Sequence, residues 1–160
     1  MVRKMFKNTK PSSKLDAFIE KYKISREYLS TNRKSVTRGL LIGTFWAFIP
    51  MPFQLAAMVA CTPFVKFNVP VAVFMILLSN PLTMPFMYYL EYMTGDYVLG
   101  MEPLKVSLSL AWFQDNLDNI FIPLYTGTAI YATSVSLFLY HSVNWLWIHS
   151  VQQEKKNRYL

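Results

Sequence analysis

The sequence has almost no cysteine, and three long stretches of it have no charge. Cys61 is the single cysteine among 160 residues, which excludes an internal disulfide and a cysteine-rich metal site. Residues 39–65, 67–90 and 119–153 contain no Asp, Glu, Lys or Arg. Hydrophobic residues make up 53% of the chain and charged residues 16%, which is too apolar for a typical water-soluble domain. The composition therefore predicts a membrane protein.

Residues that catalyse reactions or hold metal ions are also scarce. His141 and His149 are eight residues apart, and no cluster of His, Cys and Glu with metal-ligand spacing surrounds them. Glu91 directly follows an apolar stretch, so we expect its carboxylate to reach the outer boundary of the membrane, with a proton relay as the alternative. We predict no catalytic residue, metal or cofactor, no enzymatic activity, and lipid rather than nucleic acid as a partner.

Prolines and carboxamides interrupt the apolar stretches in three places, which are residues 49–54, 68–70 and 79–85. Proline lacks a backbone donor and clashes with the preceding turn, so each group predicts a helix break. At membrane depth the freed carbonyls need partners or a wet cavity. The residues that line a lipid or solute path, or alternatively stabilise the breaks, are predicted to be Pro50, Pro52, Gln54, Asn68, Asn80, Pro81, Thr83 and Pro85.

The first apolar helices are too short to cross a membrane singly. Val36 to Ile49 has 14 residues, about 21 Å of helix, against a hydrocarbon core of roughly 30 Å. Residues 36–65 therefore form either a helical hairpin that returns to its starting side or one kinked crossing. Lys66 favours the hairpin, because cytoplasmic loops are enriched in basic residues.

The rest of the chain predicts one broken crossing, one surface helix and one long membrane helix. Residues 69–99 form the broken crossing. Residues 104–113 alternate like a strand but also share a helical face, and we choose a short surface helix because an isolated strand leaves its edges unpaired. The long helix starts at Pro123 and continues to about His149. The predicted fold class is an all-α integral membrane protein with proline-broken helices, preceded by a basic amphipathic helix.

The charges divide the chain into three parts. Residues 1–38 hold eleven Lys and Arg against three Asp and Glu, whereas residues 91–118 hold five acids against one Lys. This split predicts that both termini are cytoplasmic. The predicted parts are a basic tail with an amphipathic interfacial helix (1–30), a polytopic membrane domain (31–150) and a basic cytoplasmic tail (151–160). The amphipathic helix binds anionic lipid or packs on the protein's own cytoplasmic face, and the candidates for lipid-headgroup contact are Arg33, Lys34 and Arg38.

Small residues recur every four positions in two of the predicted helices. This spacing places them on one helix face and lets helix backbones approach closely in lipid. We predict that both faces are helix contacts and that the protein forms a homo-oligomer or part of a larger membrane complex. The two sets are Gly39, Gly43 and Ala47, and Thr128, Ala132 and Ser136.

The sequences RKSVTRG at 33–39, GTFWAFIPMPFQ at 43–54, NVP at 68–70 and NPLTMP at 80–85 resemble the bacterial family known as domain of unknown function 2062 (DUF2062). The resemblance extends over roughly residues 30–150. It implies a bacterial, inner-membrane, helical protein. Relatives of this domain are attached to glycosyltransferases, which links the family loosely to envelope glycan or lipid chemistry, but the resemblance transfers no activity.

The sequence thus predicts a small polytopic protein of the bacterial inner (cytoplasmic) membrane that moves or exposes a lipid or small solute at its broken helices. The alternative is a non-transporting accessory or assembly subunit of a larger membrane complex in envelope glycan or lipid metabolism. Transport would use the polar residues at the helix breaks, whereas the accessory subunit would dock onto the larger complex through the two small-residue faces.

Overall fold

The computed structural model describes residues 26–102 and 104–157, which form helices and loops without a strand. The predicted all-helical class is confirmed over these residues. The predicted amphipathic helix lies outside the described residues except for its last few positions, which form η1. The helical segments are η1 (Arg26–Leu29), α3 (Arg33–Phe48), α4 (Gln54–Ala60), α5 (Val69–Leu77), α6 (Met84–Leu99), α7 (Leu110–Asp115) and α8 (Leu117–Lys156).

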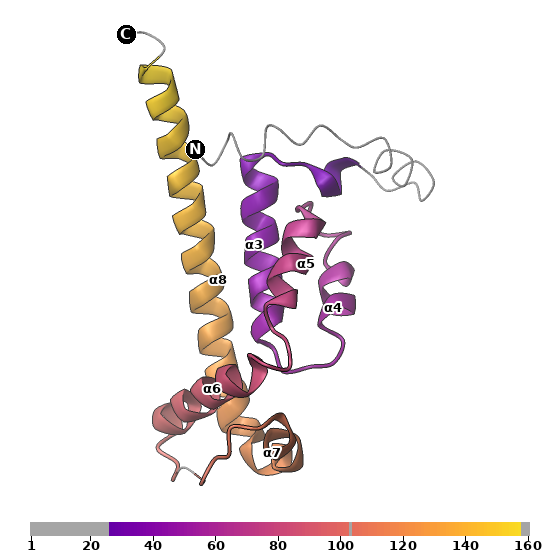
Figure 1. Cartoon of the computed structure of the whole chain (residues 1–160), viewed down its shortest axis with the longest axis vertical. Helices are drawn as coiled ribbons and strands as arrows, with labels where there is room; N and C mark the ends of the chain where they lie inside the picture. The colour runs from indigo at the N-terminus through magenta and orange to yellow at the C-terminus, as the bar shows by residue number, and fades with distance from the viewer. Residues whose placement is uncertain (1–25, 103, 158–160) are drawn as a thin grey trace.

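The longest element is α8, along which α3 and α6 pack (Figure 1). It has 40 residues, a length of about 60 Å. Within the described part of the chain it alone combines the length and the apolar composition needed to cross a membrane, and its apolar part reaches a mean hydropathy of 1.3. The prediction that this helix begins at Pro123 is wrong. The helix begins earlier, at Leu117, and Pro123 lies inside it, fully buried.

The helices α3 and α8 lie side by side and run in opposite directions. Arg33, at the start of α3, donates from Nη1 to Oδ1 of Asn144 at 2.7 Å. At the other end of α3, the ring of Phe48 stacks on Tyr131 with the centroids 6.1 Å apart. Because Asn144 follows Tyr131 in α8, the start of α3 lies beside the later part of α8. The two contacts hold the pair together over the whole length of α3.

On its other side α3 packs closely against α5 (Figure 1). A Cβ added to Gly43 would lie 2.5 Å from the carbonyl oxygen of Ala72, and one added to Gly39 would lie 2.6 Å from that of Asn68. Larger side chains would therefore push the two backbones apart. The backbone N–H of Asn68 also donates to the carbonyl of Ser35 at 3.0 Å.

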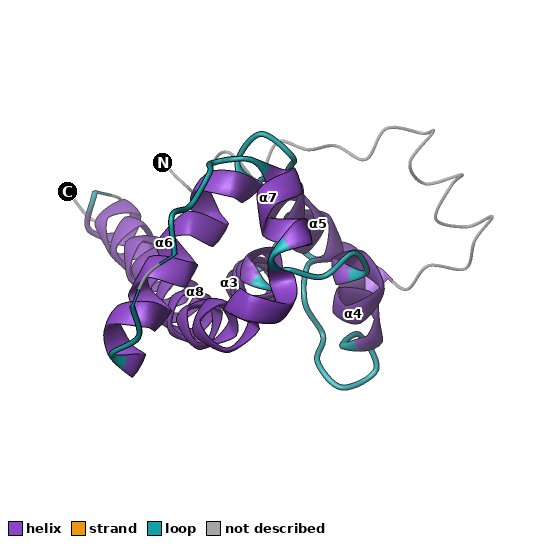
Figure 2. Ribbon diagram, turned by 90° about the horizontal axis from the view of Figure 1, so that it is seen from below, coloured by secondary structure: helices purple, strands orange, loops and turns teal. Residues whose placement is uncertain are grey.

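A second close crossing joins α6 to α8 at the lower end of the molecule. A Cβ added to Gly95 would overlap the carbonyl of Pro123, and one added to Gly127 would overlap the carbonyl of Glu91. The crossing is reciprocal, because each helix contributes one glycine and one carbonyl. Figure 2 shows α6 and α7 from this lower end. They cover a core cluster made of Tyr88, Tyr92, Phe113, Ile120 and Leu124.

The segment before α7 is less helical than predicted. We expected a surface helix in residues 104–113, but the helix begins only at Leu110, where Ser109 accepts from the N–H of Trp112 at 3.2 Å. The preceding residues form a loop, and the N–H of Leu104 donates to the hydroxyl of Tyr92 at 2.9 Å. The hydroxyl of Tyr92 thus attaches the segment to α6. It accepts a hydrogen bond that a backbone carbonyl would accept in a helix.

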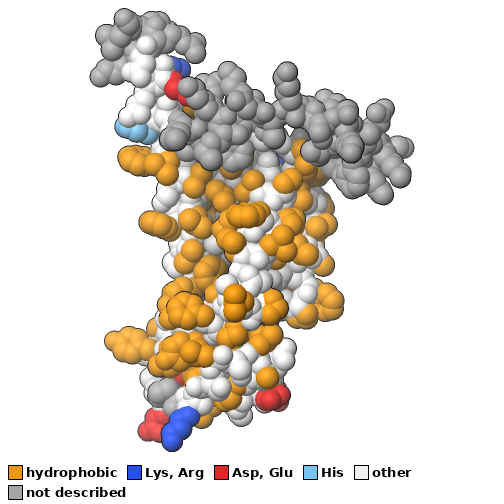
Figure 3. All heavy atoms as spheres, in the orientation of Figure 1, with side chains coloured by type: hydrophobic (Ala, Val, Ile, Leu, Met, Phe, Trp, Pro, Cys, Tyr) orange, Lys and Arg blue, Asp and Glu red, His pale blue; other side chains and the backbone are white. Residues whose placement is uncertain are grey.

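The surface of the molecule is strongly apolar between its two ends. Figure 3 shows hydrophobic side chains over most of the height of one face, with charged side chains near the two ends. Phe64, Phe74, Leu82 and Phe138 are each more than 60% exposed. Contiguous apolar surface of this extent marks contact with another apolar phase. Together with α8, it indicates that the protein associates with a membrane.

Candidate functional site

The first interruption lies between α3 and α4 and contains Pro50. Gln54 is buried and donates from Nε2 to the carbonyl of Ile49 at 2.7 Å. The hydroxyl of Tyr125, on α8, donates to the carbonyl of Pro50 at 3.0 Å. Both carbonyls beside the break therefore have side-chain partners. The contribution of Gln54 agrees with a break-stabilising role, whereas that of Tyr125 comes from a residue 75 positions away and carries no local sequence signal.

The second interruption precedes α5 and is organised by Asn68. Its Oδ1 accepts from the N–H of Val71 at 3.0 Å, which caps the helix, and its Nδ2 donates to the carbonyl of Ser30 at 3.0 Å. Asn68 is 4% exposed. One carboxamide thus satisfies a donor in α5 and an acceptor before α3, and so fixes the start of both helices relative to each other.

The third interruption separates α5 from α6 and is organised by Asn80 and Thr83. Oδ1 of Asn80 accepts from the N–H groups of Leu82 and Thr83 at 2.9 and 3.2 Å. The hydroxyl of Thr83 donates to the carbonyl of Leu78 at 2.7 Å and accepts from the N–H of Asn80 at 3.0 Å. Asn80 therefore satisfies backbone amides, and Thr83 satisfies a backbone carbonyl. Pro81 and Pro85 flank this turn.

The polar candidates do not meet in one cavity. Gln54, Asn68 and Asn80 each hold a separate turn through the local bonds described above. A cavity of about 310 Å³ does adjoin the first interruption, at the junction with α6, α7 and α8. Its lining is mainly apolar and consists of Pro50, Met51, Pro52, Met84, Tyr88, Leu110, Phe113, Gln114, Leu117 and Leu124.

A larger cavity of about 480 Å³ lies at the start of α3. Four cationic side chains line it, and among the described residues no acidic side chain does. It brings together the three predicted headgroup residues and adds Lys66, which the loop between α4 and α5 carries to this end. The lining residues are Ser30, Asn32, Arg33, Lys34, Ser35, Arg38 and Lys66.

The positive end of a helix dipole adds to this charge. Asn32 caps α3, and its Oδ1 accepts from the N–H of Ser35 at 2.8 Å. The first turn of α3 carries no acidic residue, so its amide dipoles are left to act on an anion. Ser35 itself is 6% exposed, and its Oγ has no hydrogen-bond partner among the described residues. No local sequence pattern indicates this buried hydroxyl.

Further along α3 lies an apolar groove of about 320 Å³. Its floor is α3, one wall is α8, and Cys61 lies at the other edge. The lining residues are Leu41, Ile42, Phe45, Trp46, Cys61, Thr133, Ser136 and Leu137. Lys34, Arg38, Leu41 and Phe45 follow one another at spacings of four, three and four, which places them on one face of α3. That face connects the basic cavity with the groove.

The prediction that Glu91 reaches the membrane boundary is wrong. Glu91 is 0% exposed, and its Oε2 accepts from the hydroxyl of Thr128 at 2.8 Å. Its Oε1 has no partner among the described residues. The reason is the crossing of α6 over α8, which turns this face of α6 inward. Gly95, four residues later, and Gly127, beside Thr128, are the sequence features that accompany this burial.

Both small-residue faces are buried in contacts within the chain. Gly39 and Gly43 meet the backbone of α5, and the remaining members of both sets are no more than 5% exposed. They are Ala47, Thr128, Ala132 and Ser136. These faces lie in contacts within the chain and leave little surface for a partner, so the predicted oligomer or larger complex needs a different interface.

Among the described residues, no group of three His, Cys, Asp or Glu side chains is placed to hold a metal ion. No curated protein and no solved structure matches the chain. The family model described as "Uncharacterized protein conserved in bacteria (DUF2062)" matches residues 17–156, which is most of the sequence. The chain therefore belongs to the DUF2062 family.

Proposed function

We propose that this protein is a small polytopic protein of the bacterial inner membrane that exposes or moves a lipid along the groove between α3 and α8. The observation that carries this proposal is the apolar groove, because Leu41 and Phe45, which line it, lie on the same face of α3 as Lys34 and Arg38, which line the basic cavity. A lipid has the matching pair of parts, an acyl chain and a charged headgroup. A small polar solute would find no hydrogen-bonding partners along the apolar part.

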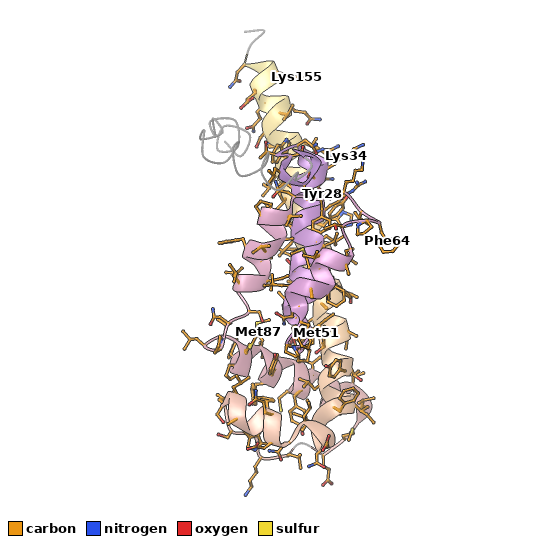
Figure 4. The ribbon with its side chains drawn as sticks, turned by 90° about the vertical axis from the view of Figure 1, so that its right-hand side faces the viewer. Tyr28, Lys34, Met51, Phe64, Met87 and Lys155 are labelled. Carbon is orange, nitrogen blue, oxygen red and sulfur yellow. The ribbon has the colours of Figure 1, made fainter. Side chains whose placement is uncertain are left out.

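The topology that we propose has both termini in the cytoplasm. Figure 4 places Lys34 and Lys155 toward the same end of the molecule, with Met51 and Met87 toward the other. Lys66 lines the same cavity as Lys34, which supports α3 and α4 as a hairpin that returns to its starting side. The basic end then faces the cytoplasm, α5 and α6 form the broken crossing, and α8 crosses back.

The interrupted helices are compatible with lipid movement. At each break, side-chain hydrogen bonds hold the helix ends in place. The helices are therefore held although none of the interrupted ones runs continuously through the membrane. The resulting short helices leave the groove open at the surface rather than enclosed in a bundle. An open groove lets the acyl chains stay in the bilayer while the headgroup moves past the protein.

Reconstituted vesicles test this proposal directly. Purified protein is inserted into vesicles that contain a phospholipid with a fluorophore on its headgroup, and an impermeant reductant then bleaches the outer leaflet. We expect bleaching of most of the fluorescence with protein and of about half without it, because half of the lipid faces inward. Leu41→Trp fills the groove and should slow the exchange. Leu77→Trp is the matched control, because Leu77 is 61% exposed on α5 and does not line the groove.

Equal bleaching in vesicles with and without protein would contradict lipid movement. Equal exchange rates for the two tryptophan variants would contradict the assignment to this groove. The alternative function, an accessory subunit, predicts no exchange together with a stoichiometric protein partner that stays bound during purification from mild detergent.

A further inference from the structure

The basic cavity at the start of α3 has features of a built anion site. Arg38 and Lys66 are both exposed side chains, yet helix packing brings them from separate segments to one cavity. The α3–α5 contact does this, because the backbone bond from Asn68 to Ser35 places the loop that carries Lys66 beside the first turn of α3. The cluster is therefore a consequence of the fold and not only of a basic stretch of sequence.

Several donors converge on this cavity. The capped N-terminus of α3 directs its dipole toward it, and four cationic side chains surround it. Guanidinium groups recognise phosphate oxygens through two parallel hydrogen bonds, and ammonium groups add compact charge. Ser35, which lines the cavity and is more than nine-tenths buried, has a hydroxyl without a partner.

We infer that this cavity binds the terminal phosphate monoester of a lipid whose acyl chain lies in the groove along α3. The inference rests on the proposed function, because it names the lipid for the same groove. The charge of the cavity favours a monoester, which carries up to two negative charges and has three free oxygens. A phosphodiester carries one charge and has a second substituent attached at the phosphate. The direction of the acyl chain along α3 follows from the order of residues on one face of this helix. Lys34 and Arg38 come first, at the phosphate, and Leu41 and Phe45 follow, along the groove.

Quenching of Trp46 tests the inference, because Trp46 lines the groove. The other tryptophans, Trp112, Trp145 and Trp147, are replaced by phenylalanine so that they do not report the bulk lipid. The full-length protein in phosphatidylcholine nanodiscs is titrated with phosphatidic acid that has brominated acyl chains. Brominated phosphatidylglycerol and phosphatidylcholine with the same chains serve as the diester probes. We expect half-maximal quenching by phosphatidic acid at a mole fraction about tenfold lower than for either diester.

Charge removal then tests the cavity itself. Arg38→Gln combined with Lys66→Gln should weaken the binding of phosphatidic acid about thirtyfold, since each basic residue near an anionic lipid contributes on the order of a fivefold factor. Lys105→Gln combined with Lys155→Gln removes the same charge from exposed positions outside the cavity and should leave binding unchanged.

Four results would overturn the inference. They are equal quenching by the monoester and the diester lipids, unchanged binding in the Arg38 and Lys66 double variant, equal losses in both double variants, and displacement of phosphatidic acid by excess inorganic phosphate. The last result would show that the cavity binds soluble phosphate. Exchange in the vesicle assay without a monoester preference would refute this inference alone, whereas a monoester preference without exchange would refute lipid movement alone.

Discussion

The tightest contact in the molecule is the crossing of α6 over α8, and Gly127→Ala is its sharpest perturbation. The added Cβ would overlap the carbonyl oxygen of Glu91 and lie 2.5 Å from its carbonyl carbon. Carbon atoms reach their optimal separation at roughly 3.5–4.0 Å, so the two helices would have to separate by about 1 Å. The obstructing atoms are backbone, and no side-chain rotation relieves the overlap.

The expected destabilisation follows from three contributions. Overpacking costs about 1–3 kcal/mol, and this case belongs in the upper part of that range, about 2–3 kcal/mol, because the obstructing atoms are backbone. Weakening the adjacent bond from Thr128 to Glu91 adds about 1 kcal/mol. The change from glycine to alanine within a helix offsets about 1 kcal/mol of this cost. We therefore expect a net loss of about 2–3 kcal/mol, or a melting temperature lower by about 4–12 °C for a chain of this size.

Thermal unfolding in detergent, followed by circular dichroism, measures this loss. The matched control is Gly100→Ala, because a Cβ there meets nothing within 4 Å. The φ of Gly100 is 65°, so alanine costs about 1–2 kcal/mol from backbone conformation alone. Gly127→Ala should therefore be the less stable of the two. A melting temperature for Gly127→Ala equal to that of the wild type would refute the close crossing.

Three further predictions use other parts of the structure. Glu91→Gln keeps an acceptor for Thr128 and removes a carboxyl group whose ionised form is costly to bury, so its melting temperature should equal or exceed that of the wild type, and a large decrease would contradict this. Thr83→Val removes the donor to the Leu78 carbonyl and should lower the free energy of chemical unfolding by about 1–3 kcal/mol. The same change at a threonine whose hydroxyl makes no hydrogen bond should not cause this loss. In a Cys61→Ser background, an impermeant maleimide applied to intact cells should label a cysteine at position 115 but not one at position 66, and the reverse pattern would invert the topology.

Features that depend on local sequence were predictable. The apolar stretches predicted helices. A proline with a carboxamide nearby in the sequence follows the ends of both α3 and α5. Gln54 and Asn68 were recognised as polar side chains in apolar surroundings, and each bonds the backbone close to it in sequence. Arg33, Lys34 and Arg38 were recognised as a basic entry to the first helix, and they line one cavity.

Features that depend on long-range packing were missed. Glu91 looked like a boundary residue because the sequence does not show that α6 crosses α8, and this crossing decides its burial. The partner of the Pro50 carbonyl, Tyr125, lies 75 positions away. Ser35 entered no prediction, because an unpartnered hydroxyl becomes visible only when the residues around it are placed. Pro123 suggested a helix start by a local rule, which the burial of its turn against α6 overrides.

The central claim is that a lipid occupies the groove between α3 and α8. The most direct measurement is nuclear magnetic resonance of the protein in nanodiscs, with labelled methyl groups at Leu41 and Ile42 in the groove and at Leu77 on the exposed face of α5. We expect cross-relaxation from acyl-chain protons to Leu41 and Ile42 to persist when a dilute lipid is the only protonated one, while that to Leu77 fades with dilution. Cross-relaxation that declines equally at all three positions would contradict the claim.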